Sequence, residues 1–370
     1  MKLITHDIYI TFLIILALTS LLMLTSNFLL AAVINFIKRR SRPIPCRIGC
    51  ISIIIPAYNE ERNIEAKIDS LWKALKGIQI DTEVLIGSDG SRDRTVEIAE
   101  TRLKEINAAN WKVVKFENEG KCNTLNKLVK IARGELIIST DADVAVPENA
   151  VKLMIDAFEA NSRLGCLSCV PVLNSSRVGS QKHYWNIEGR IRNAESLLGK
   201  LIVVTGWLYA YRRDAFEVIP KGVMADDLWI PLITLLKGYD CAQLDELEVA
   251  SEVTDEETEI KRRKRVISGG MDVVRRLFPQ LLKSPGLLFL VMAHKVNRWA
   301  IPLWLNTFAL ATIGLWRYAF FVYIFMTVLV YLIFGKKRFK SLAYAVISPL
   351  FSFAEVMSKS DFARWEHTRK

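Results

Sequence analysis

The strongest constraint on this chain is a run of thirty residues without a charged side chain, from Ile8 to Ile37. At about 1.5 Å per residue, a helix of this length exceeds the ~30 Å hydrocarbon core of a bilayer. The run is also too long for the apolar core of a signal peptide. A buried core helix is the alternative, but core helices rarely extend this far without a charge. Residues 1–37 are therefore predicted to form an N-terminal transmembrane helix.

Charge-free stretches return near the C-terminus. Ala300–Trp316 and Tyr318–Gly335 are separated by a single arginine, and they predict a hairpin of two transmembrane helices. Two shorter stretches, Ser284–Ala293 and Ser341–Ala354, are interpreted as helices in the membrane interface, and the sequence leaves open whether the second one spans the bilayer. Residues 284–370 are thus expected to contain interfacial helices, the hairpin and a short cytoplasmic tail.

Basic clusters border these apolar stretches at Lys38–Arg47 and Lys336–Lys340. The positive-inside rule places both clusters in the cytoplasm. Residues 38–283 are therefore expected to form a cytoplasmic domain of an integral protein of the plasma (inner) membrane. The formal net charge of +11 fits contact with membrane lipid. Because the basic clusters adjoin apolar spans, we expect no nucleic-acid partner.

The middle of the chain alternates short apolar runs with amphipathic patterns. Strands are predicted at Ile51–Pro56, Glu83–Gly87, Lys112–Phe116 and Leu136–Thr140, with helices at Asn63–Lys76, Thr95–Ile106 and Thr124–Ala132. This order predicts an α/β fold with a mostly parallel sheet. Ligands bind such sheets at the carboxyl ends of the strands, and the most unusual polar residues of the chain occur at those positions.

The most informative of these positions is Asp141-Ala142-Asp143, directly after an apolar strand. Two carboxylates so close together are costly unless a cation or water satisfies them. Mg²⁺ or Mn²⁺ bridging a diphosphate is a natural partner, since both ions prefer oxygen ligands. A solvated loop that caps a helix is the alternative interpretation.

Other candidates have similar pairs of interpretations. Asp89 ends a strand, so its carboxylate either accepts the imide N–H of a uracil or orders the turn that follows. Lys121 precedes a predicted helix, where it either meets a phosphate or is an exposed lysine. The adjacent acids Asp226 and Asp227 either supply a general base, or they form the N-cap and the first-turn acid of a helix.

A basic run, Lys261–Arg265, precedes Gly269-Gly270. Most of its cations are expected to lie over lipid heads. One arginine of the run could instead turn inward to a diphosphate, because a guanidinium matches the geometry of phosphate oxygens.

In this order, the motifs resemble those of the family 2 glycosyltransferases, particularly the membrane-bound branch with the cellulose, chitin, hyaluronan and poly-N-acetylglucosamine synthases. The resemblance covers about residues 50–270. The matching segments are residues 53–61 (IIIPAYNEE), 88–91 (SDGS), 118–121 (NEGK) with Leu125-Asn126, 141–143 (DAD), Gly206 with residues 211–213 (YRR), Asp226-Asp227 and the basic run with Gly269-Gly270.

The resemblance implies a GT-A-type fold and an inverting transfer from a nucleotide-diphosphate sugar, with UDP as the expected nucleotide. Asp89 would contact the base, Asp141 would face the ribose and phosphate, and Asp143 would bind Mg²⁺ or Mn²⁺. Asp227 would be the catalytic base. The remaining donor-binding residues would be Pro56, Ala57, Tyr58, Glu60, Lys121 and Arg265, and the acceptor-side residues would be Trp207, Asp226 and Val266.

The sequence departs from the synthases at their Gln-x-x-Arg-Trp signature. Arg262 stands in place of the glutamine and Val266 in place of the tryptophan, so only Arg265 is retained. Together with the small number of predicted spans, this favours transfer of one or a few sugars to a lipid or saccharide acceptor. A processive polysaccharide synthase, including one that builds a channel as a homo-oligomer, and a catalytically silent membrane scaffold remain the alternatives. A nucleotidyltransferase is disfavoured, because no glycine-rich phosphate loop follows the first strand.

Overall fold

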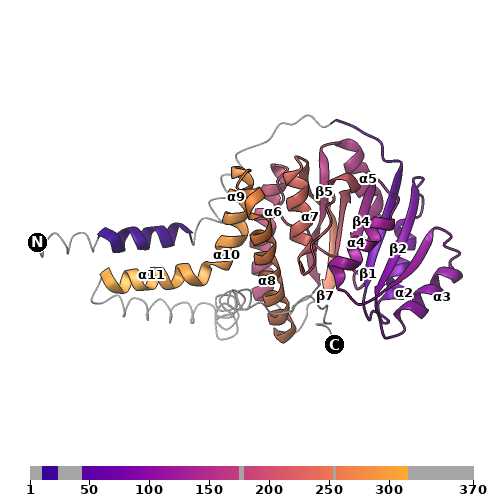
Figure 1. Ribbon diagram of the computed structural model, residues 1–370, viewed down its shortest axis with the longest axis horizontal. Helices are drawn as coiled ribbons and strands as arrows, with labels where there is room; N and C mark the ends of the chain where they lie inside the picture. Colours follow the sequence, from indigo (N-terminus) through magenta and orange to yellow (C-terminus); the bar gives the residue numbers. More distant parts are fainter. Residues whose placement is uncertain (1–10, 24–43, 175–178, 253–255, 316–370) are drawn as a thin grey trace, which may run out of the picture.

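The computed structural model describes residues 11–23, 44–174, 179–252 and 256–315, with a seven-stranded sheet at its centre (Figure 1). The strands run in the order β3-β2-β1-β4-β6-β5-β7. Their bounds are β1 Cys50–Ala57, β2 Asp81–Asp89, β3 Trp111–Phe116, β4 Leu136–Thr140, β5 Leu164–Asn174, β6 Leu208–Arg212 and β7 Asp240–Glu252.

Most neighbouring strands are parallel. β1 pairs in parallel with both β2 and β4, and β2 pairs in parallel with β3. β6 is antiparallel to β4 and β5, whereas β5 and β7 are again parallel. The expected α/β fold with a mostly parallel sheet is therefore confirmed. The carboxyl ends of β1, β2 and β4 meet at one edge of the sheet.

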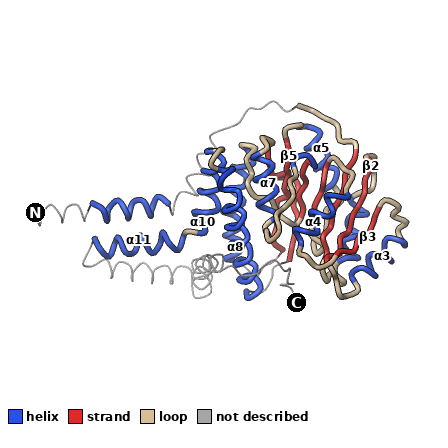
Figure 2. Tube along the Cα trace, in the orientation of Figure 1, coloured by secondary structure: helices blue, strands red, loops and turns tan. Residues whose placement is uncertain are grey.

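Helices cover both faces of the sheet (Figure 2). The helices α2 (Ile64–Ala74), α3 (Thr95–Glu105) and α5 (Ala150–Ala160) share one apolar core, while α4 (Lys121–Ile131), α6 (Gly179–Leu197), α7 (Asp226–Leu236) and α8 (Glu256–Leu281) pack around the other. β1 serves both cores, since Ile54 faces one of them and Ile53 and Ile55 face the other. This explains why the strand is a continuous apolar run without alternation.

The predicted elements of this half of the chain agree closely with the observed ones. The first three predicted strands lie within β1, β2 and β3 and are shorter by one or two residues at one or both ends, and the fourth coincides with β4. The third helix was placed too late, because α4 begins at Lys121 and not at Thr124. Its first turn is anchored by the backbone N–H groups before it, which bond to a distant carboxylate that a local pattern does not reveal.

The last described segments are helical. They are α9 (Pro285–Val291), a π-helical turn η2 (Met292–Val296), α10 (Asn297–Trp299) and α11 (Ile301–Leu315). Residues 11–23 of the first predicted span also form a helix, which extends away from the sheet on the same side as α11 (Figure 1). The Asn297 side chain donates a hydrogen bond to the Met23 carbonyl at 2.7 Å, so the end of the residue 11–23 helix contacts α10.

α11 occupies the second predicted span, and α9 with η2 occupies the first predicted interfacial stretch. The third predicted span, Tyr318–Gly335, and the stretch Ser341–Ala354 lie outside the described residues. In the described parts of the chain, none of the helices combines the length and the apolar character needed to cross a bilayer.

Candidate active site

The loops that follow β1 and β2 are tied together by hydrogen bonds. Asn59, which has a left-handed backbone (φ 54°), accepts the Arg92 backbone N–H on its side-chain oxygen at 2.8 Å. The Asn59 N–H donates to the Ser91 hydroxyl at 3.2 Å, and the N–H of buried Glu60 donates to the Thr95 hydroxyl at 2.7 Å. The predicted donor-binding residues Pro56, Ala57, Tyr58 and Glu60 lie at the end of β1 and in the loop that follows it. Tyr58 is half-buried.

Asp89 lies inside the protein at the end of β2 and is fully buried. Its carboxylate accepts the backbone N–H groups of Glu119 and Gly120, both at 2.9 Å, and the Thr124 hydroxyl at 3.0 Å. Burial raises its pKa, while these donors act in the opposite direction. In this geometry the Asp89 carboxylate orders the segment before α4, whereas the alternative interpretation of the sequence had it order the turn directly after β2. Its contact with a base stays a prediction.

A glycine is required at position 90, directly after Asp89, for a steric reason. Its φ is +69°, and a Cβ at this position would lie 2.8 Å from the Asn118 backbone nitrogen. The Asn118 side chain donates to the Asp89 carbonyl at 3.0 Å, so the turn after β2 and the segment before α4 lie in direct contact. Together these contacts hold Lys121, the first residue of α4, at the strand ends.

Asp141 and Asp143 follow β4 and are half-buried on either side of buried Ala142. Behind them lies Lys67 of α2, which is 2% exposed and donates to the Thr140 hydroxyl and to the Val144 carbonyl at 2.7 Å. Burial lowers the pKa of Lys67 to about 7, although both aspartates attract its proton. Sequence reasoning missed Lys67, whose signal was a lysine on the apolar face of an amphipathic helix.

Lys121 joins the two groups of acids that the sequence assigned to opposite sides of the reaction. Its Nζ atom lies 2.8 Å from the Asp141 carboxylate and 3.3 Å from the Asp226 carboxylate. Burial alone would lower the pKa of Lys121, but the attraction of these two carboxylates outweighs it and raises the pKa. Asp226, which is buried at the start of α7, also accepts the Tyr209 hydroxyl at 2.9 Å. Lys121 is therefore no free surface lysine.

Asp227, the second residue of α7, is half-buried. Its loss of solvent contact and the charge of Asp226 raise its pKa to about 6, although Lys121 and Lys295 act in the opposite direction. Its carbonyl accepts the Val204 N–H at 2.9 Å, which links α7 to the loop before β6. A carboxylate with this pKa is mostly ionised at neutral pH and can still take up a proton, as a general base must.

The loop before β6 brings Gly206 and Trp207 to the same place. A Cβ built on Gly206 would lie 3.7 Å from the Lys121 amine and 3.9 Å from the Asp141 carboxylate. The Trp207 carbonyl accepts the Asp141 N–H at 3.2 Å and the Thr140 hydroxyl at 2.7 Å. Trp207 is half-buried beside the acids, where its acceptor-side role remains a prediction.

The basic run lies within α8 and ends at Arg265, which is exposed. This arginine is within electrostatic reach of Asp141, Asp226 and Asp227, while the surrounding protein and the charge of Arg262 lower its pKa. Its side chain still contacts solvent, and Val266 next to it is 47% exposed. Electrostatic attraction thus links Arg265 to the acids, while Arg265 and Val266 are both exposed on α8.

The aspartates at the end of β4 suit a divalent ion that a diphosphate helps to bind. Asp141 and Asp143 supply carboxylate oxygens, which are the ligands that Mg²⁺ and Mn²⁺ prefer. The described part of the chain contains no group of three or more His, Cys, Asp or Glu residues placed to hold a metal by themselves. An ion held by these two carboxylates would take its remaining ligands from outside the chain, such as phosphate oxygens and water.

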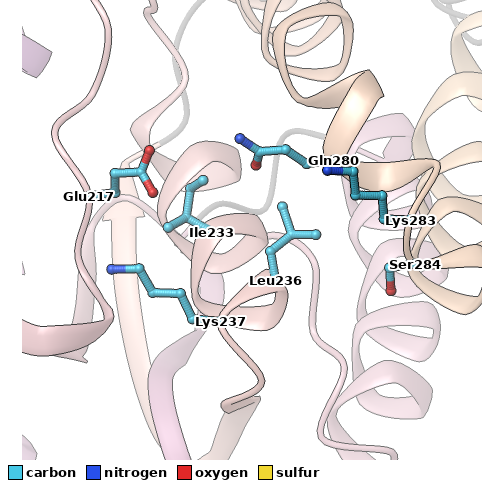
Figure 3. Close-up of a pocket in the computed structure, with 7 residues that line it drawn as sticks. All are labelled: Glu217, Ile233, Leu236, Lys237, Gln280, Lys283 and Ser284. Carbon is cyan, nitrogen blue, oxygen red and sulfur yellow. The ribbon is translucent and has the colours of Figure 1, made fainter.

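A separate cavity of about 340 Å³ lies at the opposite end of α7 from the acids (Figure 3). Glu217, Lys237 and Lys283 contribute its charged lining, and Ile233 and Leu236 contribute apolar surface. The Lys237 amine donates to the carbonyls of Asp214 and Phe216 at 3.0 and 2.8 Å. None of the carboxylates at the strand ends lines this cavity, so the chemistry of the candidate site lies elsewhere.

The overall structure is similar to that of a mannosyltransferase, PcManGT from Pyrobaculum calidifontis, solved in complex with GDP-Man and Mn2+. The TM-score is 0.71 at 19% sequence identity, and the match covers 94% of this chain and 100% of the other. This similarity identifies the fold as a GT-A-like α/β fold with a mostly parallel sheet.

Sequence comparison matches the first part of the described α/β domain to a known family. Residues 52–219 match the family model of "Glycosyl transferase family 2". The poly-beta-1,6-N-acetyl-D-glucosamine synthases of Staphylococcus epidermidis and Staphylococcus aureus (strain COL) are each 27% identical to this chain, over 256 and 258 residues. Both matches cover 66% of this chain and 61% of the relative, so they span about three fifths of the relatives' length. The chain contains a glycosyltransferase family 2 domain, and the resemblance inferred from its motifs is confirmed.

Proposed function

We propose that this protein is an inverting glycosyltransferase that moves a sugar from a nucleotide-diphosphate sugar to a lipid or saccharide acceptor at the cytoplasmic face of a membrane. The observation that carries this proposal is the position of Lys121, between Asp141 and Asp226. A cation in contact with both acids requires the donor side and the acceptor side to meet within a few ångströms. Group transfer needs this proximity, because the reacting atoms must approach to about 3–3.5 Å.

The chemical step uses Asp227. Its ionised carboxylate takes the proton of an acceptor hydroxyl, and the hydroxyl oxygen forms a bond to the anomeric carbon of the donor sugar. The bond between that carbon and the diphosphate oxygen breaks, and the electron pair leaves with the diphosphate. Attack from the side opposite the leaving group inverts the anomeric centre. The pKa of about 6 at Asp227 suits proton transfer near neutral pH.

The leaving diphosphate is expected to contact cationic groups of this chain. Lys121 and Arg265 both lie near Asp141 and supply positive charge there. Asp143, with Asp141 beside it, would hold Mg²⁺ or Mn²⁺, which neutralises charge on the departing diphosphate when it is bound. Asp89 stays in place behind this site and maintains the turn that carries Lys121.

The membrane part of the proposal rests on apolar side chains at the ends of the chain. Phe12, Leu18 and Leu22 of the residue 11–23 helix are 58%, 61% and 55% exposed, and Leu303 of α11 is 55% exposed. Exposed apolar residues gathered on neighbouring helices indicate a surface that another apolar phase covers. With the charge-free stretches and basic flanks, they support an integral membrane protein whose catalytic domain faces the cytoplasm.

The role of Asp227 can be tested with the purified full-length protein, Mn²⁺, and UDP-N-acetylglucosamine or GDP-mannose as donor. Asp227→Asn is expected to bind the donor nearly as wild type does but to release nucleotide at least 100-fold more slowly, because it removes only the proton acceptor. Asp156→Asn is the matched control, since Asp156 forms an exposed ion pair with Lys152 on α5. Weakened donor binding with an unchanged rate constant would show that the role is misassigned.

The named relatives are polysaccharide synthases, so a processive synthase is the second candidate. Val266 on the exposed side of α8 offers no flat ring on which a growing sugar chain could stack. We therefore expect products with one or a few added sugars. Size-exclusion chromatography after exhaustive reaction distinguishes these outcomes, and a high-molecular-weight polymer would favour the processive enzyme.

A further inference from the structure

A lysine, Lys67, lies on the apolar face of α2 and is only 2% exposed. Its neighbours on that face, Ile64, Ile68 and Leu71, are fully buried and belong to the core on this side of the sheet. An apolar residue would continue the face, so the packing of the helix does not by itself require a lysine here. Because a lysine is rarely buried so fully unless its amine is paired, its partners indicate what it does.

The hydrogen-bond partners of Lys67 lie on either side of Asp141 and Asp143. The Lys67 amine donates to the hydroxyl of Thr140, the last residue of β4, at 2.5 Å. It also donates to the carbonyl of Val144, directly after the second aspartate, at 2.7 Å. One side chain thus bridges both ends of residues 140–144, which we call the acidic loop. An amine has two N–H groups and an ammonium has three, so both bonds can form in either protonation state of the lysine.

The Thr140 hydroxyl extends this bridge to a second segment of the chain. Because the hydroxyl oxygen accepts from Lys67, its own proton is available for the Trp207 carbonyl, which accepts it at 2.7 Å. The same carbonyl accepts the Asp141 N–H at 3.2 Å. The backbone at the start of the acidic loop is therefore fixed between α2 and the loop before β6.

Further contacts with α2 fix the other end of the acidic loop. The Ser70 hydroxyl, one turn after Lys67, accepts the Val146 N–H at 3.2 Å and donates to the Lys67 carbonyl at 2.9 Å. Ala142 and Val144 are 4% and 3% exposed and belong to the same core as α2. The apolar side chains of the loop are thus buried, while the two aspartates remain half-buried at the end of the strand.

We propose that Lys67 is a positioning residue, which holds Asp141 and Asp143 in the arrangement that binds a divalent cation together with a nucleotide diphosphate. The inference deepens the proposed function and rests on it, because it takes these aspartates as the metal site of the transferase. The hydrogen bonds of Lys67 go to the residues that flank the aspartates, so the lysine acts through the backbone of the acidic loop. Ligands that are fixed in advance bind a cation more tightly, because less conformational freedom is lost on binding.

A role as a counter-charge predicts the opposite change in metal affinity. The charge of Lys67 is within electrostatic reach of both aspartates, and it would repel a divalent cation that binds to them. If the lysine served only to balance their charge, its removal would strengthen the binding of the cation. Removal of a positioning residue weakens that binding instead. The sign of the change therefore distinguishes the two roles.

The affinity for Mn²⁺ can be measured on the purified full-length protein from the EPR signal of free Mn²⁺, with UDP, with GDP and without nucleotide. Lys67→Met retains most of the apolar side chain but removes both hydrogen bonds. It should weaken Mn²⁺ binding about ten-fold, as is typical when a group that orients metal ligands is lost. Lys73→Met is the matched control, because Lys73 is an exposed lysine on the same helix, and this variant should bind Mn²⁺ as the wild type does.

A second pair of variants breaks the bridge and leaves the lysine in place. Thr140→Val has a side chain of similar size without the hydroxyl, and it should weaken Mn²⁺ binding roughly five-fold. Thr140→Ser retains the hydroxyl and should restore the wild-type affinity. In Lys67→Met and in Thr140→Val, amide hydrogen exchange at residues 141–146 should be faster without metal, while exchange in β1 stays at the wild-type rate. If Lys67→Met does not fold, the comparison of valine with serine at position 140 provides the test.

Equal or tighter Mn²⁺ binding by folded Lys67→Met would overturn the inference, and so would equal binding by Thr140→Val and Thr140→Ser. A wild type that binds no Mn²⁺ would overturn it as well, whereas nucleotide release in EDTA would leave the proposed transfer standing. If the variants bind Mn²⁺ more weakly but the wild type releases no nucleotide from UDP-N-acetylglucosamine or GDP-mannose, the proposed function alone is overturned.

Discussion

Replacing Lys121 with methionine tests the central contact of the site. The substitution preserves much of the side-chain volume but removes the cation that lies 2.8 Å from Asp141 and 3.3 Å from Asp226. At an effective dielectric constant of about 20, each contact corresponds to an attraction of about 5 kcal/mol before desolvation. Removing one partner of a buried pair typically costs about 3–5 kcal/mol, because the other charge remains without compensation.

The expected cost here is smaller, since Lys121 and Asp141 are 21% and 29% exposed and water screens part of the interaction. We therefore expect Lys121→Met to lower the free energy of unfolding by about 2–3 kcal/mol, or the melting temperature by roughly 5–10 °C. Lys127→Met is the matched control on the same helix. Its ion pair with Glu119 is more exposed and should contribute less than about 1 kcal/mol.

The same variant should alter the pH dependence of catalysis. Lys121 holds down the pKa of Asp227, which is about 6, so its loss raises that pKa. The activity that needs ionised Asp227 is present above this pKa and disappears as the pH falls through it. In Lys121→Met, the pH at which nucleotide release is half lost on acidification should therefore be higher than in the wild type. The measurements are thermal unfolding and nucleotide release between pH 5 and pH 8. Equal stability of Lys121→Met and Lys127→Met, with superimposable pH profiles, would refute the reasoning.

Three further predictions concern the metal, the diphosphate and the topology. Asp143→Asn should abolish turnover and leave the melting temperature within about 2 °C of wild type, and full activity of the wild type in EDTA would contradict this role. Arg265→Ala should lower kcat/KM at least ten-fold because it removes a charge-assisted contact of about 1.5–3 kcal/mol, whereas Arg262→Ala should mainly weaken membrane association; equal losses would argue against Arg265. A thiol introduced by Glu117→Cys, at an exposed position, should react with an impermeant maleimide only after cells are permeabilised, and labelling of intact cells would reverse the predicted topology.

Two native cysteines, Cys122 and Cys241, are poor reporters of that topology for a structural reason. Cys122 and Cys241 are 7% and 0% exposed, so an impermeant reagent would miss them on either side of a membrane. Burial raises the pKa of both thiols well above the ordinary value, which further lowers their reactivity. An introduced surface thiol avoids both effects.

The local sequence determined much of the fold. β1 is recognisable because a β-branched run between turns can be buried on both faces only in the middle of a sheet. α2 is recognisable because Ile64, Ile68 and Leu71 recur at helical spacing and are all fully buried. The same patterns placed Asp89 at the end of a strand and Asp141 just after one, which is where α/β sheets bind ligands.

Tertiary structure decided what these residues contact. Asp89 and Asp141 have the same local setting at the end of a parallel strand, yet Asp89 is fully buried and accepts protein donors, whereas Asp141 faces Lys121. The difference arises because the segment before α4 supplies backbone donors to Asp89 at the end of β2, whereas Asp141 after β4 is half-buried and paired with Lys121. A local pattern contains no information about which distant segment covers a strand end.

The buried contacts of Glu188 show the same limit over a longer distance. Glu188 and His294 are separated by 106 residues, and neither belongs to a motif that a sequence pattern would single out. The sequence alone determined periodicity, strand ends and the order of the acidic motifs, since these depend on neighbours along the chain. Only the tertiary structure decided the charge that surrounds each acid, because electrostatic interactions depend on distance in space and on the removal of water.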